Sequence, residues 1–249
     1  MSKKIKLGDY TLFKLLGKGS YGHVFLTVKG NNPELLATKV IDKSKMKGNK
    51  KLKYLKNEQK ILEELKHPNI IRLDHFLETK NHLFFIMEYC HGGSLSFLLE
   101  KYKKKYRKPF TLEIIQHFMS QIIEGLKYIP SKNIIHRDLK LDNILVHFKK
   151  NARKPIVHAI DYNELDNNDL LNSTIKIIDF HLSTKLNPGE LAKSLVGTPF
   201  HMDPIILKKY KQAGGYESLE GYNEKVDIWS LGIICYQMLT GDPLFTAYT

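Results

Sequence analysis

A glycine-rich segment between two strand-like runs most restricts the fold of this 249-residue chain. The segment reads GKGSYGHV from Gly17 to Val24 and matches the pattern GxGxxG. In a dinucleotide-binding fold, the glycine turn is followed by a helix. Here apolar and polar residues alternate after Gly22, which predicts a second strand, so the glycines join two strands. Such a hairpin can lie over phosphate groups, because glycine lets backbone N–H groups approach the phosphate oxygens.

The N-terminal part of the chain, up to about residue 90, carries mostly strand-like patterns. Leucines recur at helical spacing from about Asn49 to Lys66, which predicts one helix within it. Short apolar or alternating runs separated by Gly, Asn and Pro predict the strands Tyr10–Leu16, Gly22–Val28, Leu35–Ile41 and His82–Glu88.

One charged residue has an unusual place in the predicted helix. Glu58 lies three residues after Leu55 and four before Leu62, so it shares their apolar face. A carboxylate that points into a core needs a cationic partner. Lys39, at the end of an apolar strand, is the natural candidate, and its ammonium could also reach phosphates.

After Gly92 the pattern becomes helical. Thr111 is the expected N-cap of a helix with one broad apolar face. Val226–Leu239 is apolar nearly all round, which predicts a helix buried on every side and ended by Gly241. These patterns together predict an α+β chain with a small β-rich lobe and a larger helical lobe.

The formal net charge of +13 is concentrated in Lys43–Lys56 and Lys101–Lys108. A basic surface can attract nucleic acid, anionic membrane or acidic proteins. No nucleic-acid-binding motif accompanies the lysines, so solvated faces are the favoured interpretation and no specific nucleic-acid partner is expected. A basic nucleic-acid-binding module is a distant alternative.

Other bulk features indicate the cellular setting. Cys90 and Cys235 are the only cysteines, too few for a disulfide framework or a cysteine zinc site. No apolar run is long enough to span a bilayer, and the basic start leads into no apolar signal region. A soluble cytoplasmic protein without a transmembrane segment is therefore expected.

The stretch from Ile135 to Leu145 reads IHRDLKLDNIL and resembles the catalytic loop HRDLxxxN of eukaryotic protein kinases. Further along, Asp179-Phe180-His181 stands where that family carries DFG. The resemblance implies a bilobal protein-kinase-like fold over residues 10–249, with the N-lobe at 10–88 and the C-lobe at 89–249. It also implies ATP and Mg²⁺ as cofactors and a protein substrate that bears serine or threonine.

Family roles transfer to matching residues. By resemblance, Asp138 orients and deprotonates the substrate hydroxyl, and Lys140 steadies the transferring phosphoryl group. Asn143 and Asp179 are expected to hold magnesium, which prefers oxygen ligands. The resemblance also implies a stacked spine tied down by Asp227. The members of that spine are Leu62, Leu73, His136 and Phe180.

The expected nucleotide site begins with Lys39, which Glu58 would hold toward the phosphates. Met87 would be the gatekeeper beside the adenine. The full set of expected nucleotide contacts is Leu16, Gly17, Lys18, Gly19, Ser20, Tyr21, Gly22, Val24, Ala37, Lys39, Met87, Glu88, Cys90 and Leu145.

Two further stretches indicate the branch of the family. Lys140 and Gly197–Pro199 resemble the serine/threonine branch rather than the tyrosine branch. Met87–Leu95 is similar to autophagy-initiating kinases, and calcium/calmodulin-type kinases resemble the chain about equally well.

The arginine of the catalytic loop suggests regulation by phosphate. Arg137 beside Asp138 implies that a phosphate on the activation segment would pair with the guanidinium. Ser194 is the first candidate for that modification and Thr184 the second, through an activating kinase or autophosphorylation.

Several features depart from the family pattern. His181 replaces the glycine of DFG, and Met202–Ile205 stands where the family has APE. Residues 147–174 form an expected surface insertion, and the chain ends at Thr249, where the family continues through more helices, so the C-lobe is expected to be incomplete. These departures favour an alternative function, a pseudokinase that binds nucleotide as a scaffold or allosteric partner with little turnover.

Overall fold

The computed structural model divides the chain into two compact units. Unit 1 comprises Met1–Lys66 and Ile71–Cys90, and unit 2 comprises His67–Ile70 and His91–Thr249. Within them, the structure describes residues 4–19, 22–30, 34–46, 49–148, 162, 165–207 and 221–246.

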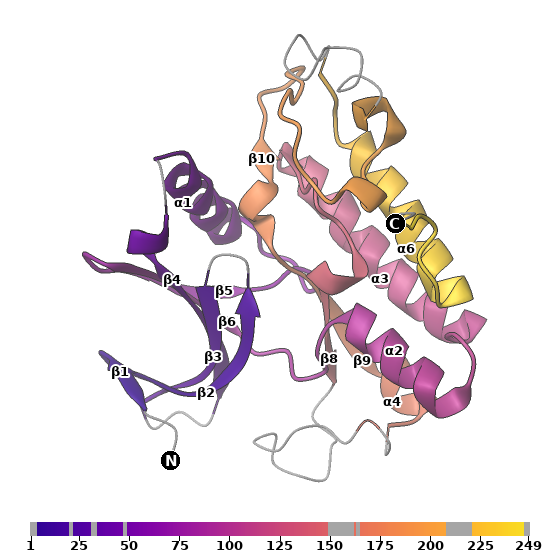
Figure 1. Cartoon of the computed structure of the whole chain (residues 1–249), viewed down its shortest axis with the longest axis horizontal. Helices are drawn as coiled ribbons and strands as arrows, with labels where there is room; N and C mark the ends of the chain where they lie inside the picture. Colours follow the sequence, from indigo (N-terminus) through magenta and orange to yellow (C-terminus); the bar gives the residue numbers. More distant parts are fainter. Residues whose placement is uncertain are drawn as a thin grey trace. The chain divides into compact units, whose positions relative to one another are not determined.

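Unit 1 is built on one antiparallel sheet, whose six described strands follow the order β1-β2-β3-β4-β6-β5 (Figure 1). Their bounds are β1 Ile5–Leu7, β2 Tyr10–Gly19, β3 Gly22–Lys29, β4 Leu35–Asp42, β5 Leu73–Glu78 and β6 His82–Glu88. The four predicted strands are present, but β1 and β5 were missed. β1 has three residues, and β5 buries only its first residue, so neither shows a clear alternation.

Helix α1, Asn49–Glu64, follows the 3-10 turn η1, Lys43–Lys45, and packs beside β5. The helix ends two residues before the predicted end. In β6, four successive residues from Leu83 to Ile86 are buried, so both faces of this strand are covered. Leu55 and Leu62 of α1 are buried with Glu58 between them, as their common face requires.

Unit 2 is mainly helical, with α3 at its centre in contact with α4, α6, β7 and β9 (Figure 1). Thr111 caps α3, because its Oγ1 accepts a hydrogen bond from Ile114 N at 3.5 Å. The helices among its described residues are α2 Leu95–Tyr106, α3 Leu112–Ser131, α4 Asn167–Leu171 and α6 Lys225–Thr240. The strand pairs are β7 Ile134–Ile135 with β10 Thr184–Lys185, and β8 Ile144–Phe148 with β9 Ser173–Ile177. The 3-10 turns are η2 Leu141–Asn143, η3 Phe180–Leu182 and η4 Pro199–His201.

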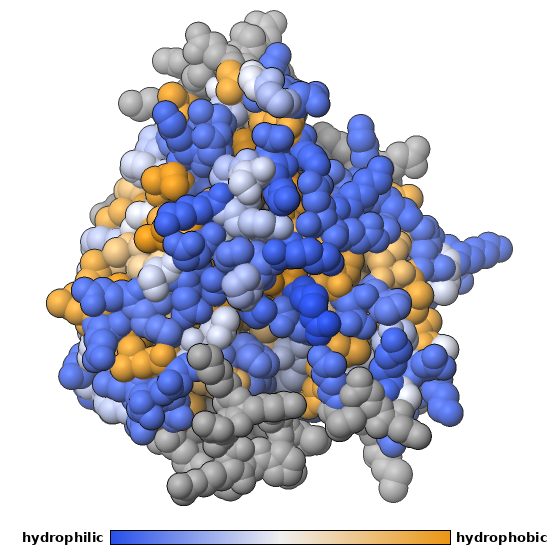
Figure 2. All heavy atoms as spheres, turned by 180° about the vertical axis from the view of Figure 1, so that it is seen from behind, coloured by the Kyte–Doolittle hydropathy of each residue, from blue (hydrophilic) through white to orange (hydrophobic). Residues whose placement is uncertain are grey.

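The prediction that the helix over Val226–Leu239 is buried on every side is wrong for the described residues. Ile228 is 58% exposed and Leu239 is 44% exposed, while Ile233, Ile234 and Met238 on the other side of α6 are buried. A helix that is apolar all round has no stripe by which to recognise its inner face. On the face of the molecule that Figure 2 presents, apolar residues are interspersed among hydrophilic ones.

The predicted insertion at 147–174 overlaps two strands at its ends, and its extent stays a prediction. Its first two residues complete β8 and its last two begin β9. Helix α4 lies inside the interval and starts with a capping box, in which Asp166 and Asp169 each accept a hydrogen bond from the other's backbone N–H. Residues 149–161 and 163–164 of the predicted insertion lie outside the described residues.

Candidate active site

Unit 1 contains the buried ion pair that the helix pattern requires. Lys39 on β4 donates from Nζ to both carboxylate oxygens of Glu58 on α1, at 3.0 and 3.3 Å. The side chain of Glu58 is 3% exposed and that of Lys39 is 16% exposed. A buried carboxylate without this cation would be strongly destabilising, so the pair fixes α1 against β4.

The glycine segment lies on the β2–β3 hairpin, with Gly17 opposite Val24 and Gly19 opposite Gly22. Packing explains one glycine, because a Cβ at Gly22 would lie 2.0 Å from the carbonyl oxygen of Val40. Packing does not explain Gly17, where a Cβ would meet no heavy atom of the described chain within 4 Å. Among the described residues, therefore, no close contact requires glycine at position 17. Ser20 and Tyr21 lie outside the described residues.

Most of the expected adenine-side residues lie on neighbouring strands of unit 1. Ala37 on β4 pairs with Leu26 on β3 and with Met87 on β6. Glu88 ends β6, where its N–H donates to Arg72 O at 3.1 Å. The remaining expected contacts are Leu16 and Lys18 on β2, Val24 on β3, Cys90 at the end of unit 1, and Leu145 on β8 of unit 2.

In unit 2, Asp227 of α6 fixes the backbone of the catalytic loop. Its carboxylate accepts hydrogen bonds from His136 N at 2.8 Å and from Arg137 N at 2.9 Å. Arg137 has a φ of 69°, a left-handed conformation that needs such support in a residue other than glycine. Burial raises the pKa of Asp227, and the charges and N–H groups of His136 and Arg137 oppose that rise.

Asp138 is the centre of a hydrogen-bonded cluster and is 5% exposed. Its Oδ1 accepts from the Thr198 hydroxyl at 2.6 Å, and its Oδ2 accepts from Asn143 Nδ2 at 3.0 Å. Lys140 Nζ lies 3.2 Å from Oδ2 and donates to Thr198 Oγ1 at 2.8 Å. The structure thus brings together Asp138, Lys140 and Asn143, and adds Thr198, whose contact the sequence did not predict.

Asp179, the second predicted metal ligand, is joined to this cluster through a backbone hydrogen bond of the residue before it. Ile178 N donates to Asn143 O at 2.9 Å, which joins the end of β9 to η2. Asp179 follows directly, with φ 68° and ψ 67° in the left-handed region. His181 Nδ1 lies 2.7 Å from Asp179 Oδ1. Phe180 packs edge-on against the His136 ring at 4.9 Å, so the unit 2 half of the expected spine is present.

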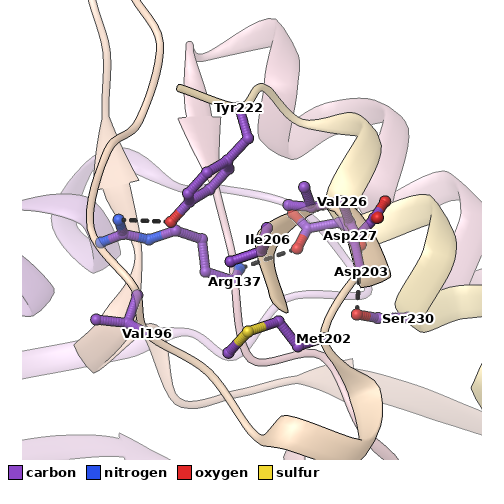
Figure 3. Close-up of a pocket in the computed structure, with 9 residues that line it drawn as sticks. All are labelled: Arg137, Val196, Met202, Asp203, Ile206, Tyr222, Val226, Asp227 and Ser230. Carbon is purple, nitrogen blue, oxygen red and sulfur yellow. Dashed lines mark hydrogen bonds between the residues drawn. The ribbon is translucent and has the colours of Figure 1, made fainter. Parts of the chain in front are cut away.

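A small pocket lies beside the catalytic loop, between residues 196–206 and α6 (Figure 3). Arg137 donates from Nε to Leu182 O at 2.6 Å and from a terminal nitrogen to the Tyr222 hydroxyl at 3.3 Å. Tyr222 in turn donates to Ser194 O at 2.6 Å. Tyr222 was not predicted as a site residue. It is placed by a backbone bridge to Ala192, a residue distant in sequence, and no local pattern indicates that bridge. The pocket is lined by Arg137, Val196, Met202, Asp203, Ile206, Tyr222, Val226, Asp227 and Ser230.

The model of the protein kinase domain family matches residues 10–249, nearly the whole chain. The chain belongs to the eukaryotic serine/threonine protein kinase family. This kinase chain is 34% identical over 245 residues to serine/threonine-protein kinase PLK4 of Danio rerio, across 98% of this chain and 22% of that protein. It is 34% identical over 242 residues to PLK4 of Xenopus laevis, across 97% of this chain and 22% of the relative. It is 30% identical over 262 residues to serine/threonine-protein kinase ATG1 of Colletotrichum lindemuthianum, across 97% of this chain and 37% of the relative.

The kinase chain therefore spans less than two fifths of the length of these relatives. The ATG1 match agrees with the weak resemblance to autophagy-initiating kinases, while the PLK4 matches show that a second subfamily is comparably similar. Within the described residues, no helix combines the length and apolar character needed to cross a membrane.

Proposed function

We propose that this kinase domain transfers the γ-phosphate of ATP to serine or threonine hydroxyls of protein substrates. The cluster around Asp138 carries the proposal. A hydroxyl, that of Thr198, lies 2.6 Å from the Asp138 carboxylate and 2.8 Å from the Lys140 ammonium. A substrate hydroxyl that reacts with a phosphoryl group needs the same two neighbours, a carboxylate to take its proton and a cation to balance the charge.

In the proposed reaction, the substrate oxygen forms a bond to the γ-phosphorus while the bond to the β,γ-bridging oxygen of ATP breaks. Asp138 orients the hydroxyl and receives its proton, and ADP leaves with the bridging oxygen. Lys140, 3.2 Å from Asp138 Oδ2, balances negative charge on the transferred group. Asn143 holds Asp138 by donating to its backbone carbonyl at 2.7 Å and to its carboxylate, so the carboxylate faces the substrate in one orientation.

We assign phosphate binding to Lys39 and the glycine segment. The ion pair with Glu58 orients the Lys39 ammonium. At Gly17 an added Cβ would meet no heavy atom of the described residues within 4 Å, and this open space supports close approach of a ligand to the backbone. The other proposed nucleotide contacts are Leu16, Lys18, Gly19, Ser20, Tyr21, Gly22, Val24, Ala37, Met87, Glu88, Cys90 and Leu145.

The donor set fits magnesium. An amide oxygen from Asn143 and a carboxylate from Asp179 are hard oxygen donors. The described residues contain no group of three or more His, Cys, Asp or Glu that could hold a metal ion by itself. Magnesium is commonly held by one or two protein ligands together with substrate phosphates, so this sparse set suits it. When bound, the ion would neutralise the charge of the phosphates.

Phosphorylation of Ser194 is the proposed means of regulation. Ser194 is exposed, and its carbonyl is linked through the Tyr222 hydroxyl to the Arg137 guanidinium. A phosphate on Ser194 would bring negative charge beside that cation. Thr184 is the second choice, because it pairs with Ile135 in the β10–β7 ladder and is partly buried. Mass spectrometry that finds a fully active enzyme with both residues unmodified would contradict this regulation.

The test of the function is phosphate transfer from Mg-ATP to a generic basic protein, with the phosphorylated residues identified by mass spectrometry. Lys39→Met should abolish transfer, while Lys53→Met, at an exposed lysine of α1, should leave it unchanged. If the wild type and both variants transfer phosphate at the same background rate while ATP stabilises the fold, the result would instead support a nucleotide-binding scaffold. At present the relatives do not favour a scaffold, because they are named as serine/threonine-protein kinases. A cytoplasmic location also remains a prediction.

A further inference from the structure

His181 stands where the family pattern has glycine, and its side chain is turned into the protein. It lies in η3 and is 8% exposed. Its Nδ1 is 2.7 Å from Oδ1 of Asp179, two residues earlier. The substitution for glycine therefore does more than remove a flexible residue, because it adds a hydrogen bond to the carboxylate that we assign to the metal.

The backbone at this place does not require glycine at position 181. Asp179 is in the left-handed region, with a φ of 68°, and such a conformation persists only where the surroundings hold it. His181 is not among the described residues with positive φ. The unusual backbone angle thus belongs to Asp179, and the bond from His181 restrains the side chain of that same residue.

The turn that carries His181 is itself held. Ser183 N donates to Phe180 O at 3.0 Å, which closes η3, and Ser183 Oγ donates to His136 O at 3.1 Å. Phe180 packs against the His136 ring from inside the unit. The imidazole is therefore presented to Asp179 from a turn that is tied to the catalytic loop.

We propose that His181 is a positioning residue, which holds the Asp179 carboxylate in the orientation that binds the divalent cation. This inference rests on the proposed function, since it takes Asp179 as a metal ligand. Outer partners that hydrogen-bond to metal ligands typically change metal affinity by about 10–100-fold when they are mutated. Loss of the His181 donor should therefore weaken cation binding by about 10-fold or more, while nucleotide binding without the cation stays unchanged.

Three variants separate positioning from simple filling of space. His181→Asn keeps an N–H donor near the position of Nδ1, His181→Leu fills similar space without a donor, and His181→Gly restores the family residue. His75→Leu is the matched control, because His75 is an exposed histidine of unit 1 whose Nδ1 lies 3.2 Å from the carboxylate of Asp74.

The primary measurement is Mn²⁺ binding by electron paramagnetic resonance, with the full chain and a non-hydrolysable ATP analogue. The Leu and Gly variants should bind Mn²⁺ about 10-fold more weakly or worse, and Asn and the His75→Leu control should bind it like the wild type. Hydrogen exchange without metal or nucleotide gives a second measurement. Amides of residues 178–183 should exchange faster in the Leu and Gly variants than in the Asn variant.

Two results overturn the inference. In the first, all variants bind Mn²⁺ like the wild type. In the second, the Asn variant loses as much Mn²⁺ affinity as the Leu variant, which shows that loss of the N–H donor does not cause the weaker binding. If the Leu variant does not fold, the comparison of Asn with Gly decides. If the wild type binds neither Mn²⁺ nor the analogue, the proposed function fails. In that case hydrogen exchange still tests the restraint by His181, and amides of residues 178–183 that exchange equally fast in the Gly variant and the wild type would refute it.

Discussion

Replacement of Asp227 by asparagine should destabilise unit 2 through two backbone N–H groups. The carboxylate accepts from His136 N and Arg137 N and is 3% exposed. Each hydrogen bond to a charged group contributes about 1.5–3 kcal/mol, and a buried donor left without a partner costs about 1–3 kcal/mol. Asparagine has one acceptor oxygen, so it can keep one bond, in weaker neutral form, and turns an N–H group toward the other donor.

The expected loss of unfolding free energy is about 2–4 kcal/mol, because relief of the buried charge offsets part of the lost bonds. For a chain of this length that corresponds to a fall in Tm of roughly 5–15 °C. The assay is urea and thermal unfolding of the full chain. Asp242→Asn is the control, since its carboxylate is 73% exposed and pairs with Lys103 on the surface. An Asp227→Asn variant as stable as this control would refute the assignment of Asp227 as the anchor of the catalytic loop.

Three further outcomes follow from particular contacts. Gly22→Ala should lower the unfolding free energy by about 1–3 kcal/mol because its Cβ would meet the backbone, whereas Gly17→Ala should keep stability and weaken ATP binding measured by calorimetry. Thr198→Val removes the hydroxyl bound to Asp138, so kcat should fall by about 10–100-fold while ATP affinity stays near that of the wild type. Burial, and then the nearby charge of His147, lower the pKa of His91 from 6.5 to about 4. Between these values the unfolded chain binds a proton that the folded chain does not, so stability should rise with pH, and His91→Leu should flatten that rise in urea unfolding.

The local sequence pattern was sufficient to predict a contact where a charged residue lies on an apolar face. Glu58 on an apolar helical face needed a cation, and Lys39 on a nearby strand provides it at 3.0 Å. The resemblance to the kinase catalytic loop, rather than local pattern, predicted a second group of residues. Asp138, Lys140 and Asn143 lie within six positions of one another, so a single turn brings them together.

Contacts that join distant segments were not predictable from local pattern. Thr198 reaches Asp138 across 60 positions, and Tyr222 reaches Arg137 across 85, so neither side chain carries a periodic signal of its role. The buried face of α6 could not be predicted for another reason. Apolar residues surround that helix, and only tertiary packing selects which of them are buried.

The most direct test of the central claim is the rate of γ-phosphate transfer to serine or threonine by Asp138→Asn at saturating Mg-ATP. Proton transfer by a positioned side chain contributes about 10²–10⁴-fold, so the rate should fall by that factor relative to the wild type. Asp142→Asn is the matched control, since Asp142 is an exposed carboxylate of the same loop, and its rate should equal that of the wild type. An Asp138→Asn variant that binds ATP and transfers phosphate as fast as Asp142→Asn would contradict the account.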